Sequence, residues 1–181
     1  MFDPAAETRL RRFSKTMARV TTLGMLLIAA AVSLVFLIPD WTQNVLLAKL
    51  GQTGAGLALS PGHLAAAAAV MAVPVGVMLY GMAQARALFL GFAKGNVFTL
   101  ASARRLRDFA ACVLAQAILG PLSTTALVLA LTLNNPPMKP QLVIALSSND
   151  YVVLIIGGVL LAIAWIMVEA CRIADEHASF V

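Results

Sequence analysis

The sequence predicts an all-α membrane protein with four transmembrane helices arranged as two hairpins. Three observations support this: four long apolar segments, a composition that is 61% hydrophobic but only 12% charged, and Lys and Arg residues that gather in alternate connections. A water-soluble domain of 181 residues would need far more polar surface. Runs such as LLIAAAVSLVFLI do not alternate as the strands of a membrane barrel do, so the segments are expected to be helices.

Each apolar segment is long enough to cross a bilayer core, which takes about 20 helical residues. The first exceeds the apolar part of a signal peptide and lacks a clear cleavage site, so we expect it to be an anchor. Pro74 and Pro121 should bend the second and third spans, and Gly158-x-x-x-Ala162 should let the fourth approach a neighbour closely. We expect a single four-helix transmembrane domain over residues 1–181, with spans at about 20–38, 64–84, 109–133 and 151–168.

The positive charges predict the orientation. Only Lys49 and Lys139 fall in the first and third connections, whereas all other Lys and Arg residues precede the first span, follow the fourth or lie between the second and third. By the positive-inside rule both termini and the middle connection are cytoplasmic. The basic residues are expected to fix this topology and to contact anionic headgroups, and direct binding to nucleic acid is not expected. They are Arg9, Arg11, Arg12, Lys15, Arg19, Arg86, Lys94, Arg104, Arg105, Arg107 and Arg172.

The middle connection is too patterned to be a simple loop. Gly95-Asn96 predicts a chain reversal, because both residue types tolerate positive φ. Thr99 is placed to cap a helix that begins near Leu100 and continues into the third span, although Ser102 stands where a capping box would have Glu or Gln. We expect this segment to form an elbow at the membrane interface.

The first outer connection, residues 39–63, is long enough to hold structure of its own. WTQNVLLAKL could form a short helix lying on the membrane. Similar phrases, LALS at 57–60 and IALS at 144–147, precede the second and fourth spans. We keep as a hypothesis that these stretches pair as a small extracytoplasmic β-ribbon.

Residues that could carry chemistry are scarce. His63 and His177 fall on opposite sides of the predicted membrane, which disfavours a shared haem or metal site. Cys112 and Cys171 lie near cytoplasmic helix ends without CxxC spacing, so we expect reduced cysteines that pack as small apolar residues. We therefore expect no catalytic residue, no metal, no cofactor and no enzymatic activity.

Two polar residues within or beside the spans are candidates for function, because such residues are costly in lipid. Gln116 in the third span is expected to bridge two helices, and Glu169 to pair with Arg172 at i,i+3. The Ser123-Thr124-Thr125 run is expected to hydrogen-bond to helix carbonyls near Gly120-Pro121.

Two stretches carry a family resemblance: LGFAKGNVFTLASARRLRDFA before the third span, and VEACRIADEHASFV at the end of the fourth. They resemble the bacterial four-span membrane proteins of the domain of unknown function 2975 family. The resemblance implies a multi-pass protein of the bacterial cytoplasmic (inner) membrane, without an established catalytic residue or cofactor. It also implies a context, since such proteins are often encoded beside a very small helix-turn-helix DNA-binding protein.

The predicted function is that of a non-enzymatic membrane regulator or scaffold that binds a small cytoplasmic helix-turn-helix transcription regulator. Its docking surface would combine the elbow at 94–107 with the terminal segment at 172–181. The alternative is a small transporter or channel subunit, a homo-oligomer with a path lined by Gln116, Ser123 and Thr124. The candidate docking residues are Lys94, Gly95, Phe98, Thr99, Arg104, Arg105, Arg107, Arg172, Glu176 and Phe180.

Overall fold

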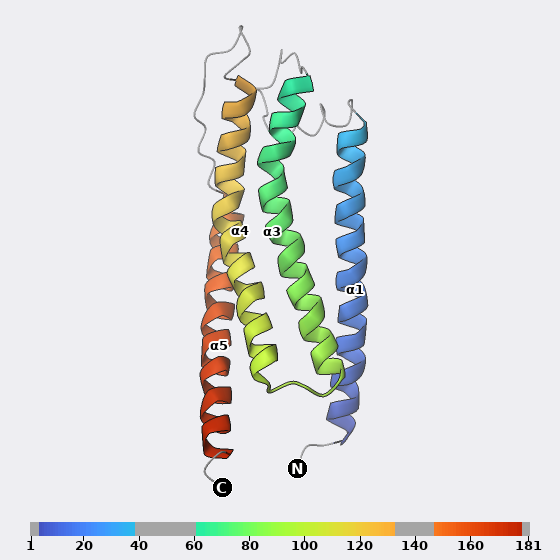
Figure 1. Ribbon diagram of the computed structural model, residues 1–181, viewed down its shortest axis with the longest axis vertical. Helices are drawn as coiled ribbons and strands as arrows, with labels where there is room; N and C mark the ends of the chain where they lie inside the picture. The colour runs from blue at the N-terminus through green and yellow to red at the C-terminus, as the bar shows by residue number, and fades with distance from the viewer. Residues whose placement is uncertain (1–3, 39–60, 133–146, 179–181) are drawn as a thin grey trace.

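The computed structural model describes residues 4–38, 61–132 and 147–178, and the regular structure in these ranges is helical. Both chain termini lie at one end, here called the terminus end, and the other is called the far end (Figure 1). The predicted short outer helix and nearly all of the predicted β-ribbon lie outside the described residues. The helices are α1 (Pro4–Leu37), α3 (Pro61–Ala93), α4 (Leu100–Thr132) and α5 (Ser148–Ala178).

All four helices are long and apolar enough to cross a membrane, so the chain is a multi-pass membrane protein. They contain 31 to 34 residues, or roughly 50 Å at about 1.5 Å per residue, which exceeds the roughly 30 Å of a bilayer core. The helices extend beyond the predicted spans mainly at the terminus end, where α1 begins at Pro4 and α5 continues to Ala178. These extra turns carry every described Lys and Arg except Lys94, which lies in the turn between α3 and α4.

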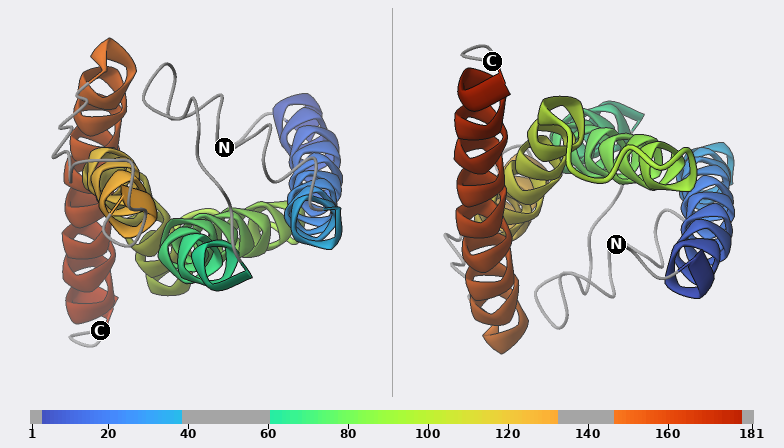
Figure 2. Two further views of the ribbon diagram at one scale, coloured as in Figure 1. Left: turned by 90° about the horizontal axis from the view of Figure 1, so that it is seen from above. Right: turned by 90° about the horizontal axis from the view of Figure 1, so that it is seen from below.

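The four helices form a bundle that is open on one side. Consecutive helices pack together, α1 with α3, α3 with α4 and α4 with α5. Figure 2 shows α1 and α5 at the two edges of a curved row, with α3 and α4 between them. Large apolar side chains on the edge helices are accordingly exposed, among them Leu26 on α1 and Ile166 on α5. In a bilayer such side chains contact lipid, so their exposure carries no hydrophobic penalty.

Small residues set the close approaches between helices. A Cβ atom added to Gly81 of α3 would lie 2.9 Å from the Cβ of Cys112 on α4. A Cβ atom at Gly157 of α5 would lie 2.9 Å from the backbone nitrogen of Leu114. Gly158 has nothing within 4 Å, so the predicted close approach at Gly158 is wrong by one residue. The face that α5 turns toward α4 carries Gly157 and the fully buried Ala164 instead.

The turn between α3 and α4 is a Schellman motif. Gly95 has φ of +88°, and its N–H donates to the carbonyl of Phe92 at 3.0 Å. The N–H of Asn96 reaches back to the carbonyl of Gly91 at 3.1 Å. The predicted reversal is confirmed at Gly95, whereas Asn96 keeps a negative φ because one left-handed residue completes the motif.

The predicted cap of α4 is confirmed. α4 begins at Leu100, and the Oγ1 of Thr99 accepts a hydrogen bond from the backbone N–H of Ser102 at 3.2 Å. Ser102 does not reach back to the Thr99 backbone, because its hydroxyl donates to the carbonyl of Asn96 at 2.7 Å. The buried serine thus ties the start of α4 to the preceding turn.

Candidate functional site

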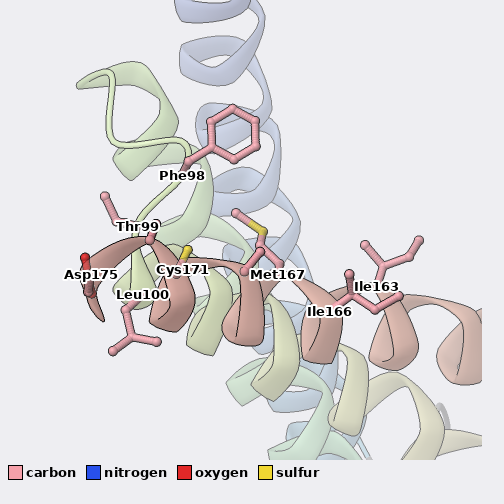
Figure 3. Close-up of a pocket in the computed structure, with 10 residues that line it drawn as sticks. Phe98, Thr99, Leu100, Ile163, Ile166, Met167, Cys171 and Asp175 are labelled. Carbon is pink, nitrogen blue, oxygen red and sulfur yellow. The ribbon is translucent and has the colours of Figure 1, made fainter. Parts of the chain in front are cut away.

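A groove of about 670 Å³ opens at the terminus end, between the start of α4 and the second half of α5 (Figure 3). The two segments predicted to form a docking surface, 94–107 and 172–181, both contribute to it. The sequence names these segments but does not place them side by side, because they are separated by the whole of α4 and most of α5. The lining residues are Phe98, Thr99, Leu100, Ile163, Ile166, Met167, Ala170, Cys171, Ala174 and Asp175.

Phe98 occupies the turn side of the groove. Its side chain is 76% exposed, although it is a large apolar group. The residue on its C-terminal side, Thr99, is held by the helix cap, so the backbone that carries the ring is fixed at both sides. An exposed aromatic ring on a fixed backbone is well suited to bind an apolar surface, because little conformational entropy is lost.

The α5 side of the groove is a helix face that sequence reasoning missed. Ile163, Met167, Ala170 and Ala174 follow the i, i+4, i+7, i+11 spacing of one helical stripe. That stripe could have been read from the sequence, but every apolar residue of a membrane span is a candidate for lipid contact. Asp175 adds the charged group of the lining.

The basic residues of the elbow have different surroundings. The half-buried Arg105 donates from Nη1 to the carbonyl of Ala87 at 2.8 Å and so joins α4 to α3. Arg107 pairs with the adjacent Asp108 at 3.0 Å. Arg104 is exposed, as is Lys94, the last residue before Gly95. Arg105 therefore has a structural task, whereas Arg104 and Lys94 project from the surface.

The predicted pair between Glu169 and Arg172 is confirmed, with 3.1 Å between the carboxylate and the guanidinium. Arg172 also reaches the carboxylate of Glu176 at 3.4 Å, so it lies between two acidic residues along α5. All three side chains are more than half exposed. Phe180, the last predicted docking residue, lies outside the described residues.

A second hollow, of about 520 Å³, lies between α3, α4 and the beginning of α5. It brings together Gln116, Ser123 and Thr124, the three residues predicted to line a path. Gln116 donates from Nε2 to the carbonyl of Pro74 at 2.6 Å, which confirms that it bridges two helices. The hollow also contains Asp150, which sequence reasoning did not single out.

The expected bonds to helix carbonyls are present in the run that begins at Ser123. Ser123 and Thr124 donate to the carbonyl of Gly120 at 2.9 and 3.1 Å, and Thr125 donates to that of Pro121 at 2.9 Å. α3 and α4 continue through Pro74 and Pro121. Each proline lacks the N–H that would bond to the carbonyl four residues earlier, so that carbonyl oxygen loses its usual helical hydrogen bond.

The chemistry of the described residues offers little else. Both cysteines are free; Cys112 is buried, and Cys171 lines the terminus-end groove. Within residues 4–38, 61–132 and 147–178, no three His, Cys, Asp or Glu side chains come close enough together to hold a metal ion.

One family matches the chain, over residues 47–181, and is described as protein of unknown function DUF2975. The chain belongs to this family. No curated protein and no solved structure matches it. The family match begins ahead of α3 and covers the Schellman turn, α4 and α5, so both the groove and the second hollow consist of family residues. α1 precedes the matched region.

Proposed function

We propose that this protein is a non-enzymatic component of the bacterial cytoplasmic membrane that holds a small helix-turn-helix transcription regulator at the terminus end of its helices. The groove between the start of α4 and the end of α5 is the observation that carries this proposal. The identity of the partner rests on the family context described above. Retention at the membrane would keep such a regulator away from DNA.

The distribution of charge supports a cytoplasmic position for the groove. Every Lys and Arg within the described residues belongs to the half of its helix nearer the terminus end or to the turn there (Figure 1). By the positive-inside rule this end faces the cytoplasm, with both termini inside and two helical hairpins crossing the membrane. A soluble regulator would meet the groove from that side.

The groove has the character expected of a site for an amphipathic helix. Its apolar part includes Ile163, Ile166 and Met167, and its polar part is formed by Thr99 and Asp175. The carboxylate of Asp175 forms no ion pair with the described side chains, so it is available to a positively charged residue of the partner. DNA-binding proteins are usually basic, which makes this the complementary charge.

The test is an in-cell crosslink followed by purification of the tagged protein and identification of bound proteins by mass spectrometry. We expect one small helix-turn-helix protein to be recovered from cells with the intact chain. Phe98→Ala should lower its recovery at least tenfold, and truncation after Arg172 should abolish it. Phe13→Ala is the matched control, because Phe13 is also exposed but lies on α1, away from the groove.

Unchanged recovery with a correctly inserted Phe98→Ala variant would contradict the proposal. So would an equal loss with Phe13→Ala, which would show a general effect of removing exposed aromatic rings. Recovery of copies of the chain alone would favour the second candidate function.

That second candidate is a small transporter or channel subunit that acts as an oligomer. The hollow at Gln116, Ser123 and Thr124 favours it, because the structure gathers these polar residues. Solute or ion flux into liposomes that contain the purified protein tests it, with Gln116→Leu expected to lower the flux. A monomer without flux would exclude this function.

A further inference from the structure

The hollow beside Gln116 contains a carboxylate that no Lys or Arg of the described residues balances. Asp150 is the one Asp, Glu, Lys or Arg residue of the described chain that belongs to the far-end half of its helix. No described Lys or Arg lies within ion-pair distance of it. The groove that would bind a regulator is at the opposite end of α5, so this second site does not depend on the proposed function.

The half-buried Asp150 lies beside the middle part of α4. Its Oδ1 would be 3.4 Å from a Cβ atom added to Gly120. Gly120 is twelve residues before the end of α4 at Thr132, about 18 Å along a helix that rises about 1.5 Å per residue. A carboxylate on a membrane-spanning helix is costly unless a positive charge or hydrogen-bond donors accompany it, and such residues are usually functional.

The two oxygens of this carboxylate differ, because the described residues bond to only one of them. Oδ2 accepts hydrogen bonds from the backbone N–H of Ser147 at 2.9 Å and from its hydroxyl at 3.0 Å. The backbone N–H of Asp150 is bonded in return to the Ser147 Oγ at 3.2 Å, which completes a capping box at the start of α5. Oδ1 makes no hydrogen bond with the described residues and lies close to Gly120, at the edge of the hollow.

Most other polar side chains of the hollow already donate a hydrogen bond inside the protein. Gln116 donates to the carbonyl of Pro74, and Ser123 and Thr124 donate to the carbonyl of Gly120. What these side chains still offer is mainly acceptors, the Oε1 of Gln116 and the lone pairs of two hydroxyls, beside the second N–H of the Gln116 amide. Together with Oδ1 of Asp150 they form a negatively charged set of acceptors.

We propose that this hollow binds a protonated primary amine. An ammonium group has three donors and a positive charge, which matches a carboxylate surrounded by uncharged acceptors. A hollow of about 520 Å³ is far larger than a bare metal ion needs, and no metal-binding group of three His, Cys, Asp or Glu exists in the described ranges. The amine would be a small molecule from the outer medium or the headgroup of an ethanolamine lipid.

The test uses the full-length protein in nanodiscs of phosphatidylcholine, whose quaternary ammonium has no N–H donor. Ethanolamine is titrated at pH 7 and binding is followed by isothermal calorimetry. We expect saturable binding, and at least tenfold weaker binding of tetramethylammonium, which has the same charge but no donors. A second experiment tests whether the amine is a lipid headgroup. The protein is placed in nanodiscs of mixed phosphatidylethanolamine and phosphatidylcholine, released, and analysed by native mass spectrometry. We expect the ethanolamine lipid to remain bound in preference to phosphatidylcholine.

The variant Asp150→Asn keeps an acceptor for the Ser147 cap but removes the charge. It should weaken ethanolamine binding at least tenfold, or abolish the preference for the ethanolamine lipid, while leaving regulator recovery unchanged. Gln116→Leu should weaken binding less, because it removes one uncharged acceptor. The matched control is Asp175→Asn, which removes a carboxylate at the other end of α5.

Four results would overturn the proposal. Three are the absence of both ethanolamine binding and lipid preference, equal affinity for tetramethylammonium, and binding that Asp150→Asn leaves intact. A loss of binding with Asp175→Asn equal to that with Asp150→Asn would also overturn it, since the charge of the whole protein would then be responsible. Failure of regulator recovery has no bearing on any of these measurements.

Discussion

The two hollows on α5 differ in how their polar groups are used. The terminus-end groove is mostly apolar, with an exposed ring at Phe98 and one carboxylate at Asp175. The hollow beside Gln116 combines an apolar wall from α3 with polar side chains, of which Gln116 and Ser123 donate to backbone carbonyls. The first suits a surface that buries apolar area, and the second suits a small charged ligand. Both depend on the packing of α5 against α4.

The comparison also shows two ways of holding a functional group. Phe98 is positioned by backbone hydrogen bonds of the Schellman turn and the Thr99 cap, so its side chain remains unused by the fold. Asp150 is positioned by its own side chain, since one carboxylate oxygen caps α5. Substitution of Phe98 should therefore change binding alone, whereas substitution of Asp150 must preserve an acceptor to leave the helix start intact.

The largest effect should come from separating α4 and α5, which would disrupt both hollows together. In Gly157→Leu the new side chain would meet the backbone of Leu114, and we expect the free energy of unfolding to fall by about 3 kcal/mol. Gly158→Leu is the matched control, because nothing lies within 4 Å of it, and it should be neutral or stabilising by up to about 1 kcal/mol. Reversible unfolding in mixed micelles measures both, and equal losses would contradict the packing described here.

A smaller effect, limited to the terminus-end groove, is expected from filling it. Ala170→Phe places a ring among the lining residues, and we expect regulator recovery to fall about tenfold, or about 1.4 kcal/mol, with ethanolamine binding unchanged. Ile173→Phe adds a ring to an exposed position of α5 outside the lining, so recovery should not change. If both variants lowered recovery alike, the partner would not bind in the groove.

The turn that presents Phe98 should be sensitive to the one residue with positive φ. Gly95→Ala forces a Cβ atom into the left-handed region at φ +88°, at a cost of about 1 kcal/mol. We expect a lower thermal stability and a weaker partner interaction, with the second hollow unaffected. Asn96→Ala is the control, since Asn96 bonds to the turn through its backbone and has negative φ. Unchanged stability of Gly95→Ala would show that the turn is not constrained.

The smallest effect is expected at the ion pairs of α5. Arg172 is 64% exposed and contacts Glu169 and Glu176 on one helix face, so Arg172→Ala should lower the free energy of unfolding by about 0.5 kcal/mol or less. Thermal unfolding at low and high salt measures this, and a larger loss would show that the pairs are less exposed to solvent than the structure shows. If regulator recovery falls while stability does not, Arg172 contacts the partner directly.

Local features proved readable from the sequence. The four apolar helices, the start of α4 at Leu100, the Thr99 cap and the Glu169–Arg172 pair each follow from residues close together in the chain. An amide in lipid needs a hydrogen-bond partner, so the sequence predicts that Gln116 bridges two helices. It does not predict that the partner is the carbonyl of Pro74. Orientation, localisation and the partner stay predictions.

Only the tertiary structure shows how each helix is rotated about its axis and shifted along it relative to its neighbour. An apolar helix in lipid has no polar face to show which side is buried, so the sequence could not choose Gly157 over Gly158 as the contact with α4. For the same reason it could not place Phe98 across from Met167, or Asp150 beside Gly120. The sequence by itself determined the four membrane-spanning segments and the cap at Thr99, because hydrophobic transfer and backbone hydrogen bonding act locally. Packing between helices alone decided which residues meet.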